Sequence, residues 1–272
     1  MLYAEPIFRM GGDSFITAEF GDDGSLSLNL YVLSVERKIL HSEIPGLIDT
    51  TALRTTIMVH YDPFVIRGFQ LIALLRELVA AGIDIPELVP SRVVQLPVHY
   101  NDPWTRECAK EFGVRPNLEI IAEDNAISLE RVIEIHSQPT YFVSYISFMF
   151  GSFGAFPIDP PAVLKTSKYK VPRKWTPEGT LGVGGTTTAF YSVDSPGGIM
   201  MLGRVPVKTF DLDGQCPFFK ENPLLFRPGD RIRFLPIESA EYDYVKKNRD
   251  DYDYQIEDGW IESTKYRNLS YH

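Results

Sequence analysis

The sequence predicts an α+β fold, in which a small N-terminal α/β domain of ferredoxin-like layout precedes a β-barrel. Three observations support this. The first ninety residues alternate strand and helix patterns, a segment with two prolines follows at 83–91, and short strands separated by Gly and Pro turns fill 140–237. With 272 residues and 44% hydrophobic content, the chain can bury a real core. We expect domains at 1–90 and 91–237, and an extension at 238–272.

The N-terminal part reads as strand, helix, strand, strand, helix. Residues 13–20 alternate like a strand, and 25–40 have apolar residues near helical spacing with Ser25 as the N-cap. Two β-rich runs lie within 47–61. Residues 64–81 carry a strong apolar stripe and stop at Gly82. This order of elements is typical of a ferredoxin-like sandwich.

The second part opens with a strand at 92–99, followed by helices at 103–112 and 128–137. Ser128 is the expected cap of the second helix. From Thr140 onward, aromatic strands and tight turns replace the helical pattern. We therefore expect the barrel to begin there.

The overall charge argues against several classes of protein. The formal net charge of −9 does not suit nucleic-acid binding, which needs a basic face. No run approaches the roughly 20 apolar residues of a membrane span, and no basic segment followed by an apolar core opens the chain. We expect a cytoplasmic protein. Cys108 and Cys216 lack metal or redox spacing, which favours free buried thiols.

Residues 172–204 are the most informative stretch. Short β-type runs are interrupted by many glycines, among which Gly184, Gly185, Gly197 and Gly198 are the candidates for a binding role. Glycines in a strand pattern mark bulges, corners, or places where a ligand approaches the backbone. We predict a site wall built mainly from backbone, and the competing interpretation is that these glycines only form turns.

Several motifs together resemble one known family. They are HSQPTYFVSYISFMFGSFGAFPIDP, VPRKWTPEGTLGVGG, SPGGIMMLGR and RPGDRIRFLPI, with GDSFITAEFGD and VHYDP nearer the start. The chain is similar over nearly all of 11–237 to the B-type subunit of 5-oxoprolinase and to the first subunit of allophanate hydrolase. The same family forms one half of the carboxyltransferase domain of biotin-dependent urea carboxylase. The resemblance implies a cyclophilin-like β-barrel and an active site shared with a C-type partner subunit.

The sequence also departs from the lactam-opening branch of that family. Residues 147–153 stand where those members have Gly-Phe-x-Pro-Gly-Phe, and 184–188 stand where they have Gly-Gly-Gln-Thr-Gly. Glutamine recognises an amide with both a donor and an acceptor, whereas Thr186 offers a hydroxyl and a methyl. Residues 166–185 are similar to the urea carboxylase version, so we lean toward the carboxyltransferase branch.

Charged residues in this stretch are candidates for holding a carboxylate, a phosphate or a carboxybiotin. Arg173, Lys174 and Arg204 have suitable side chains, since arginine recognises planar anions at two points. The alternatives are that Arg173 and Lys174 are solvated loop charges and that Arg204 belongs to a structural ion pair.

His136 and Tyr191 are further candidates. His136 lies near a predicted helix C-terminus, where its charged form would be stabilised and could bind the last carbonyls. A catalytic role, with Arg204, is the other interpretation. Tyr191 is a candidate for substrate binding, although Tyr141, Tyr145 and Tyr191 could simply pack in the barrel.

Motifs for independent catalysis are absent from the sequence. It has no P-loop, dinucleotide fingerprint, G-x-S-x-G elbow or biotin-carrier motif, and its five histidines are scattered. We expect no bound metal. ATP or carboxybiotin would arrive with partner subunits, which the resemblance identifies as the C-type subunit and either a biotin carboxylase or an A-type subunit.

The tail at 238–262 holds nine Asp or Glu against three Lys or Arg, with four tyrosines. Such a run is typical of a solvated surface helix or arm, and the alternative is a partner-docking arm. Our main hypothesis is a B-type subunit that acts on a urea-like, amide or lactam substrate. The alternative is a regulatory protein that inhibits a histidine kinase, since the family includes one; prolyl isomerase activity is a weaker possibility.

Overall fold

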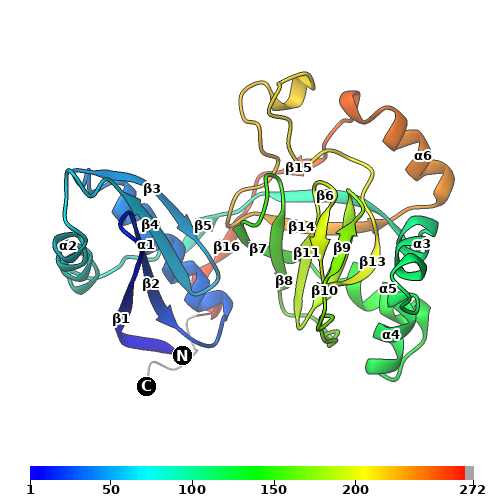
Figure 1. Ribbon diagram of the computed structural model, residues 1–272, viewed down its shortest axis with the longest axis horizontal. Helices are drawn as coiled ribbons and strands as arrows, with labels where there is room; N and C mark the ends of the chain where they lie inside the picture. The colour runs from blue at the N-terminus through cyan, green and yellow to red at the C-terminus, as the bar shows by residue number, and fades with distance from the viewer. Residues whose placement is uncertain (267–272) are drawn as a thin grey trace. The chain divides into compact units, whose positions relative to one another are not determined.

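The computed structural model describes residues 1–266 and divides the chain into two compact units (Figure 1). The first unit comprises Met1–Ser91 and the described part of the segment that begins at Gly259. The second unit is Arg92–Asp258. The chain therefore leaves the first unit once and returns to it near the C-terminus.

The first unit is an antiparallel four-stranded sheet with two helices. Its elements are β1 (Leu2–Gly11), β2 (Phe15–Gly21), α1 (Leu26–Leu40), β3 (Leu47–Ala52), β4 (Thr56–Tyr61) and α2 (Gly68–Ala80). The strand order is β1-β2-β4-β3. In a ferredoxin-like sheet, a last strand after the second helix pairs beside the first one. Here the edge position beside β2 is occupied by β1, which comes before β2 in the chain and was not predicted from the sequence.

Local sequence explains most element boundaries in this unit. The Ser25 side chain accepts a hydrogen bond from Leu28 N at 3.1 Å, which confirms the predicted cap. The second helix begins at Gly68, later than the predicted residue 64. The Asp62 carbonyl accepts hydrogen bonds from the amides of Val65 and Ile66. These bonds form a turn before the helix, and the turn contains residues that were expected to begin the helix.

The second unit is a closed barrel of seven strands, which confirms the predicted α+β class with a β-barrel. The strands are β6 (Val93–Tyr100), β7 (Tyr141–Ile146), β8 (Phe153–Pro157), β10 (Thr180–Gly184), β11 (Thr187–Phe190), β13 (Met200–Arg204) and β14 (Arg231–Pro236). The order β13-β10-β11-β8-β7-β14-β6 closes through a β13–β6 pairing. The β14–β6 pair is parallel and the others are antiparallel. Closure removes the exposed edges that an open sheet would present.

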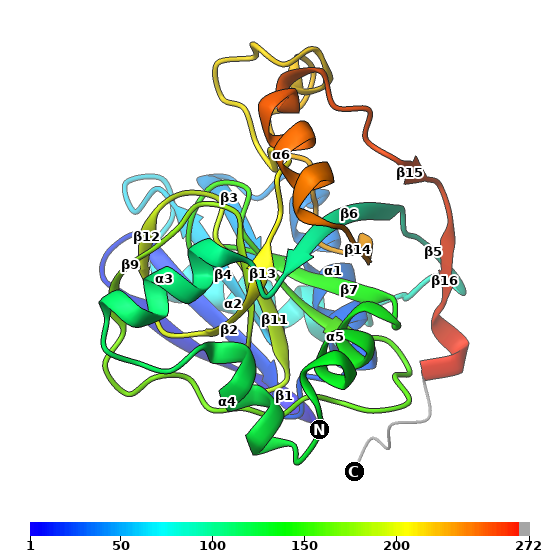
Figure 2. The same ribbon diagram turned by 90° about the vertical axis from the view of Figure 1, so that its right-hand side faces the viewer.

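Helices cover one side of the barrel, as Figure 2 shows for α3, α4 and α5. These are α3 (Pro103–Glu111), α4 (Asn117–Asp124) and α5 (Leu129–Ser137), of which α4 was not predicted. Ser128 caps α5 as expected, with Arg131 N donating to its hydroxyl at 3.2 Å. Among residues 1–266, none of the helices combines the length and apolar character needed to cross a bilayer.

Short elements complete the structure. Two small sheets pair β9 (Arg173–Thr176) with β12 (Ser195–Gly197) and β5 (Leu88–Pro90) with β16 (Trp260–Glu262), while β15 (Ile256–Glu257) pairs with β6. The 3-10 turns are η1 (Pro217–Phe219), η2 (Arg249–Asp251) and η3 (Ser263–Tyr266).

The acidic tail forms a surface helix, as one form of the expectation had it, and one face of it packs on the barrel. Its helix α6 (Ser239–Lys247) buries Tyr242 and Val245, and Tyr254 is buried further on. The acidic residues of 238–258 stay exposed. Net charge predicted the solvated face but not the apolar face that packs.

Candidate functional site

A single segment, residues 165–172, gathers most of the predicted site residues. Gly185 N donates to Thr166 O at 2.8 Å, and Tyr169 N donates to Gly198 O at 2.8 Å. The Lys168 side chain lies over Gly184, where an added Cβ would be 2.5 Å from Lys168 Cε. The β10–β11 turn and the β12 end therefore lie along the same segment.

The β10–β11 turn borders an open hollow of about 460 Å³, here named the turn hollow. Its lining residues are Asp124, Lys165, Thr166, Ser167, Gly185 and Thr186. Gly185 has a φ of +66°, which favours glycine, and no other heavy atom comes within 4 Å of a Cβ built there. Thr186 is exposed. The wall combines the backbone of the turn and the Thr186 hydroxyl with Asp124, Lys165 and Ser167, and a binding role for it stays a prediction.

Arg173 lies in β9 and is only 3% exposed, so the interpretation as a solvated loop charge is wrong for it; Lys174 is exposed. The Arg173 Nη2 donates to Ile199 O at 2.9 Å, and Nε donates to Thr176 Oγ1 at 3.3 Å. Burial lowers the pKa of the guanidinium. Among residues 1–266, its Nη1 has no hydrogen-bond partner.

Gly197 and Gly198 pack against aromatic side chains beside Arg173. A Cβ at Gly197 would lie 1.9 Å from Tyr191 Oη, so only glycine leaves room for that phenol. At Gly198 the nearest atom is Tyr169 O at 3.3 Å. Tyr191 is buried, and burial raises the pKa of its hydroxyl. The close approach at Gly197 therefore serves packing, and whether either glycine also contacts substrate stays a prediction.

His136 lies inside the barrel unit, where it is 1% exposed. Its Nδ1 is 2.8 Å from Tyr100 Oη and its Nε2 is 3.0 Å from Thr188 Oγ1. Burial lowers the pKa of His136 to about 3, so the ring is neutral and one nitrogen donates while the other accepts. The expectation of a charged imidazole that binds helix carbonyls is wrong.

A small pocket of about 10 Å³ lies beside His136 and shares one lining residue with the turn hollow. Both Thr186 and Thr188 line this pocket, and Thr186 also lines the hollow. Because Thr188 is held by the buried histidine, His136 anchors the strand that begins just after the turn. Its role here is positional, and direct action on substrate stays a prediction.

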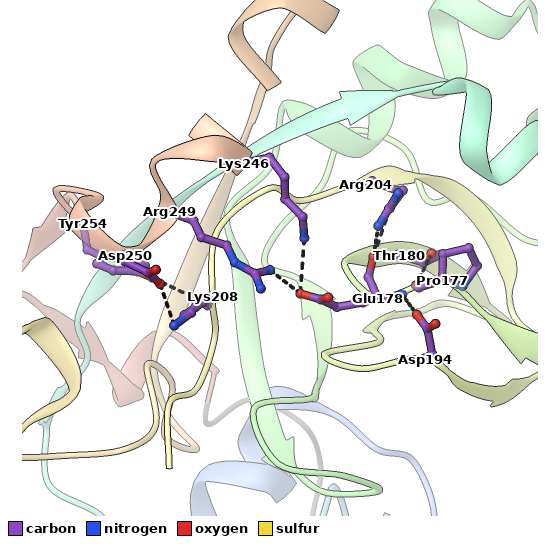
Figure 3. A network of polar contacts seen from close by, with 10 residues as sticks. All are labelled: Pro177, Glu178, Thr180, Asp194, Arg204, Lys208, Lys246, Arg249, Asp250 and Tyr254. Atoms are coloured by element: carbon purple, nitrogen blue, oxygen red, sulfur yellow. Dashed lines mark hydrogen bonds and ion pairs between the residues drawn. The ribbon is translucent and has the colours of Figure 1, made fainter. Parts of the chain in front are cut away.

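Arg204 lies apart from this group, at the end of β13 (Figure 3). Its Nε and Nη2 donate to Glu178 O at 3.0 Å and 2.5 Å, and its guanidinium lies 5.2 Å from the Trp104 ring centroid. The expected ion pair with a carboxylate is replaced by a backbone carbonyl and an aromatic face. Within the described part of the chain, all of these contacts are internal.

Four residues that sequence reasoning did not single out support the site. Asp124 accepts a hydrogen bond from Thr166 Oγ1 at 2.6 Å. Asn117 Nδ2 donates to Tyr169 Oη at 2.6 Å, which fixes the ring under Arg173. Thr166 and Tyr169 lie within the motif similar to urea carboxylase, which could have indicated them. Nothing in the pattern pointed to Asn117, because it comes from the unpredicted helix α4.

Reactive side chains are scarce around this site. Cys108 is 1% exposed, and burial raises the pKa of its thiol to about 11, which leaves little thiolate at neutral pH. Cys108 and Cys216 are both free and buried, as predicted. No group of three or more His, Cys, Asp or Glu residues within 1–266 could hold a metal ion.

Comparisons with known proteins give this geometry a context. A family profile described as "Carboxyltransferase domain, subdomain C and D" matches residues 6–220. The chain is 28% identical to the B-type subunit of 5-oxoprolinase from Bacillus subtilis over 248 residues, which cover 87% of this chain and 95% of that protein. It is 24% identical to the urea amidolyase of Saccharomyces cerevisiae over 267 residues, which cover 92% of this chain and only 14% of the relative.

A solved structure shows the same fold. The urea carboxylase of Kluyveromyces lactis aligns with a TM-score of 0.88 at 21% identity, covering 98% of this chain and 26% of that one. The profile match spans most of the chain, and the motifs that resembled this family lie within or beside it. The protein therefore belongs to the carboxyltransferase domain family, subdomains C and D, together with the B-type subunit of 5-oxoprolinase and the corresponding part of urea amidolyase.

Proposed function

We propose that this chain is the B-type half of a two-part enzyme, either carboxyltransferase-like or an ATP-dependent amidohydrolase. Its substrate is a urea-like, amide or lactam compound. The turn hollow forms one wall of the active site, and a C-type partner subunit supplies the opposite wall. The observation that carries this proposal is that the hollow is open: its lining residues form one side, and the other side faces solvent.

The chemistry of the hollow supports binding better than independent catalysis. Carbonyl activation requires donors that meet a developing oxyanion, and backbone N–H groups near a glycine turn can supply them. The Gly185 N–H already donates to Thr166 O, so the Thr186 N–H is the backbone donor that we propose for this role. Asp124, the acidic side chain of the hollow, already accepts a hydrogen bond from Thr166. A group that moves protons would come from the partner.

The buried side chains of His136 and Cys108 do not supply a proton-transfer group either. His136 is neutral with both ring nitrogens engaged, and the Cys108 thiol is buried with a raised pKa. Arg173 contributes positive charge without a carboxylate neighbour that forms an ion pair with it among residues 1–266. Its cationic field would stabilise negative charge that develops near β9 and β12.

The residues present fit the two expected cofactors differently. ATP needs a phosphate cradle of several N–H groups and cations, whereas the hollow contributes Lys165 alone as a basic lining residue. We therefore assign ATP to another subunit. A carboxylated ureido ring is flat and neutral except at its carboxylate, and the Gly185–Thr186 turn leaves space beside its backbone for such a group. When bound, carboxybiotin supplies the carboxyl group that is transferred.

Partner-dependent turnover tests the proposal. The chain, a C-type partner and their mixture are assayed with ATP and with urea or 5-oxoproline, adding a biotin carboxylase for the carboxylation arm and an A-type subunit for the 5-oxoproline arm. We expect turnover only in mixtures that contain both halves. Equal rates with and without the partner would contradict the shared site, and stable binding to a histidine kinase alone would favour the regulatory alternative.

Thr186→Gln tests which branch the chain follows. Glutamine would restore the amide side chain of the lactam-opening members, so we expect the ratio of kcat/KM for 5-oxoproline over urea to rise by about tenfold. Ser167→Gln is the matched control, because it places the same amide elsewhere in the hollow. An unchanged ratio in Thr186→Gln would mean that this position does not select substrate.

A further inference from the structure

A second cavity of about 350 Å³ lies in the barrel unit, and none of the predicted site residues lines it. We name it the charged pocket. Its lining residues are Glu178, Gly179, Phe190, Ser192, Val193, Val207, Lys208, Thr209, Phe210, Asp211, Leu212, Asp213 and Arg249. Its volume falls within the range of small-molecule sites. None of these residues was a sequence candidate, and the function proposed above does not use them.

Two cations line this pocket and retain free donor capacity. Within residues 1–266, Arg249 gives one hydrogen bond, from Nη1 to Glu178 Oε1 at 2.6 Å, although a guanidinium has five N–H donors. Lys208 Nζ lies 2.6 Å from Asp250 Oδ1 and 3.6 Å from Asp211 Oδ2. Figure 3 shows these two head groups on the same side of Glu178, and no contact is drawn on the second terminal nitrogen of Arg249.

Two of the three acidic lining residues are engaged by other protein groups. Asp211 accepts the amide of Cys216 at 2.7 Å and that of Asp213 at 3.2 Å, and Lys208 neutralises it. One oxygen of Glu178 takes both Arg249 and Lys246, the latter at 3.2 Å. The third acid, Asp213, is exposed. The N–H groups that Arg249 does not use on Glu178 complement a ligand with acceptor oxygens.

The remaining walls are apolar and carry one unsatisfied hydroxyl. Phe190 and Val207 are buried, whereas Val193 and Leu212 are 39% and 55% exposed at the mouth. Thr209 is 2% exposed, and its Oγ1 has no hydrogen-bond partner among residues 1–266. This oxygen is shielded from solvent and faces Gly151, where an added Cβ would lie 2.6 Å from it, so it is not part of the open surface of the pocket.

We propose that the charged pocket binds a small organic carboxylate. Arg249 and Lys208 hold its carboxyl group, and its apolar body lies against Phe190, Val193 and Leu212. Arginine suits this role because its planar fork matches a carboxylate at two points. The proposal rests on the pocket alone and stands whether or not the chain shares an active site.

Benzoate is a suitable probe, and benzamide is its neutral match of nearly equal size. Each is titrated into the full chain while backbone amide NMR shifts are followed. We expect benzoate to saturate with shifts centred on residues 190–193 and 207–213, and benzamide to bind about tenfold more weakly because it lacks the charge. Equal affinities, or shifts centred elsewhere, would overturn the proposal.

Three variants localise the effect. Arg249→Gln should weaken benzoate about tenfold and change benzamide little. Leu212→Glu leaves the ion pairs of the pocket intact and should also weaken benzoate binding, because it places a like charge at the mouth. This variant keeps the test valid if Arg249→Gln unfolds the tail. Arg131→Gln removes an exposed arginine that pairs with Glu134, outside the pocket, and should change nothing. Unaltered benzoate affinity in both pocket variants would contradict the assignment.

Discussion

The turn hollow and the charged pocket belong to the same barrel unit but are built differently. The buried, uncharged His136–Thr188 hydrogen bond anchors the strand that follows the turn hollow, and the Thr166–Asp124 hydrogen bond lies in the wall of the hollow. Ion pairs between half-exposed side chains hold the charged pocket, with Glu178 at their centre. Buried contacts resist salt, whereas partly exposed pairs are screened. The two regions should therefore respond to different perturbations.

The two regions also differ in how far apart their residues are in the sequence. The turn hollow draws on 165–167 and 185–186, which one continuous motif spans, with Asp124 added from outside. The charged pocket combines 178–179, 190–193, 207–213 and 249. A local motif could indicate the first, but only the closed barrel and the folded tail bring the second together.

The largest expected effect concerns His136. Its pKa falls from 6.5 to about 3 on folding, so the unfolded chain binds more protons below pH 6.5 and the native state loses stability as the pH drops toward 3. Between pH 7 and 4.5 this loss amounts to about 3 kcal/mol. Urea unfolding at several pH values should show a smaller loss in His136→Gln than in the parent.

His41→Gln is the control for that experiment, because it replaces an exposed histidine. Its unfolding free energy should follow the parent at every pH. If the parent and His136→Gln curves ran parallel from pH 7 to 4.5, the buried neutral histidine would not support the turn hollow as described.

The next effect compares adjacent glycines. Gly197→Ala places a methyl 1.9 Å from Tyr191 Oη, and the required rearrangement should cost about 2 kcal/mol of unfolding free energy. Gly198→Ala meets its nearest atom at 3.3 Å and should cost less than about 1 kcal/mol. Chemical denaturation measures both. Equal losses would show that the Tyr191 contact does not determine the choice of glycine.

The smallest effect concerns Glu178. Burial alone would raise its pKa, but Lys246 and Arg249 outweigh burial and lower it below 4.5. The carboxylate therefore contributes stability above that pH, and the contribution disappears as the pH falls through the lowered pKa. Glu178→Gln should cost about 1 kcal/mol at pH 7 and low salt, discounted here for partial exposure.

Added salt sharpens the comparison. The difference between Glu178→Gln and the parent should shrink at 1 M NaCl, where the screening length is about 3 Å. The Gly197→Ala loss should stay constant. Glu221→Gln, at an exposed position, gives the baseline. A Glu178 effect that persists at high salt would contradict the account of the charged pocket.

Much of the fold could be predicted from sequence, because its local signals agreed with the final packing. Ser25 and Ser128 cap the helices they were expected to cap. Strand β1 was not predicted because its apolar and polar residues do not alternate regularly. Most of its residues are exposed despite the sheet pairing. Helix α4 was not predicted because it is eight residues long and follows Pro116, which offers no side-chain cap.

The site was predictable only where a motif is continuous. Gly185 and Thr186 border the turn hollow, and their role in binding stays a prediction. Arg204 and Arg173 looked alike in sequence and differ in the structure. Arg204 bonds a carbonyl and an aromatic ring, whereas Arg173 retains an unpaired buried nitrogen among residues 1–266. Such partners come from distant segments, so no spacing rule could distinguish the two.

Hydrogen exchange on adding a C-type partner tests the central claim most directly, namely that the turn hollow is one half of a shared site. The chain is labelled alone and in the assembled complex, and peptides covering the two regions are compared. The account predicts slower exchange at 165–172 and 184–187, with little change at 207–213 in the charged pocket. Protection elsewhere, with unchanged exchange around Gly185 and Thr186, would contradict it.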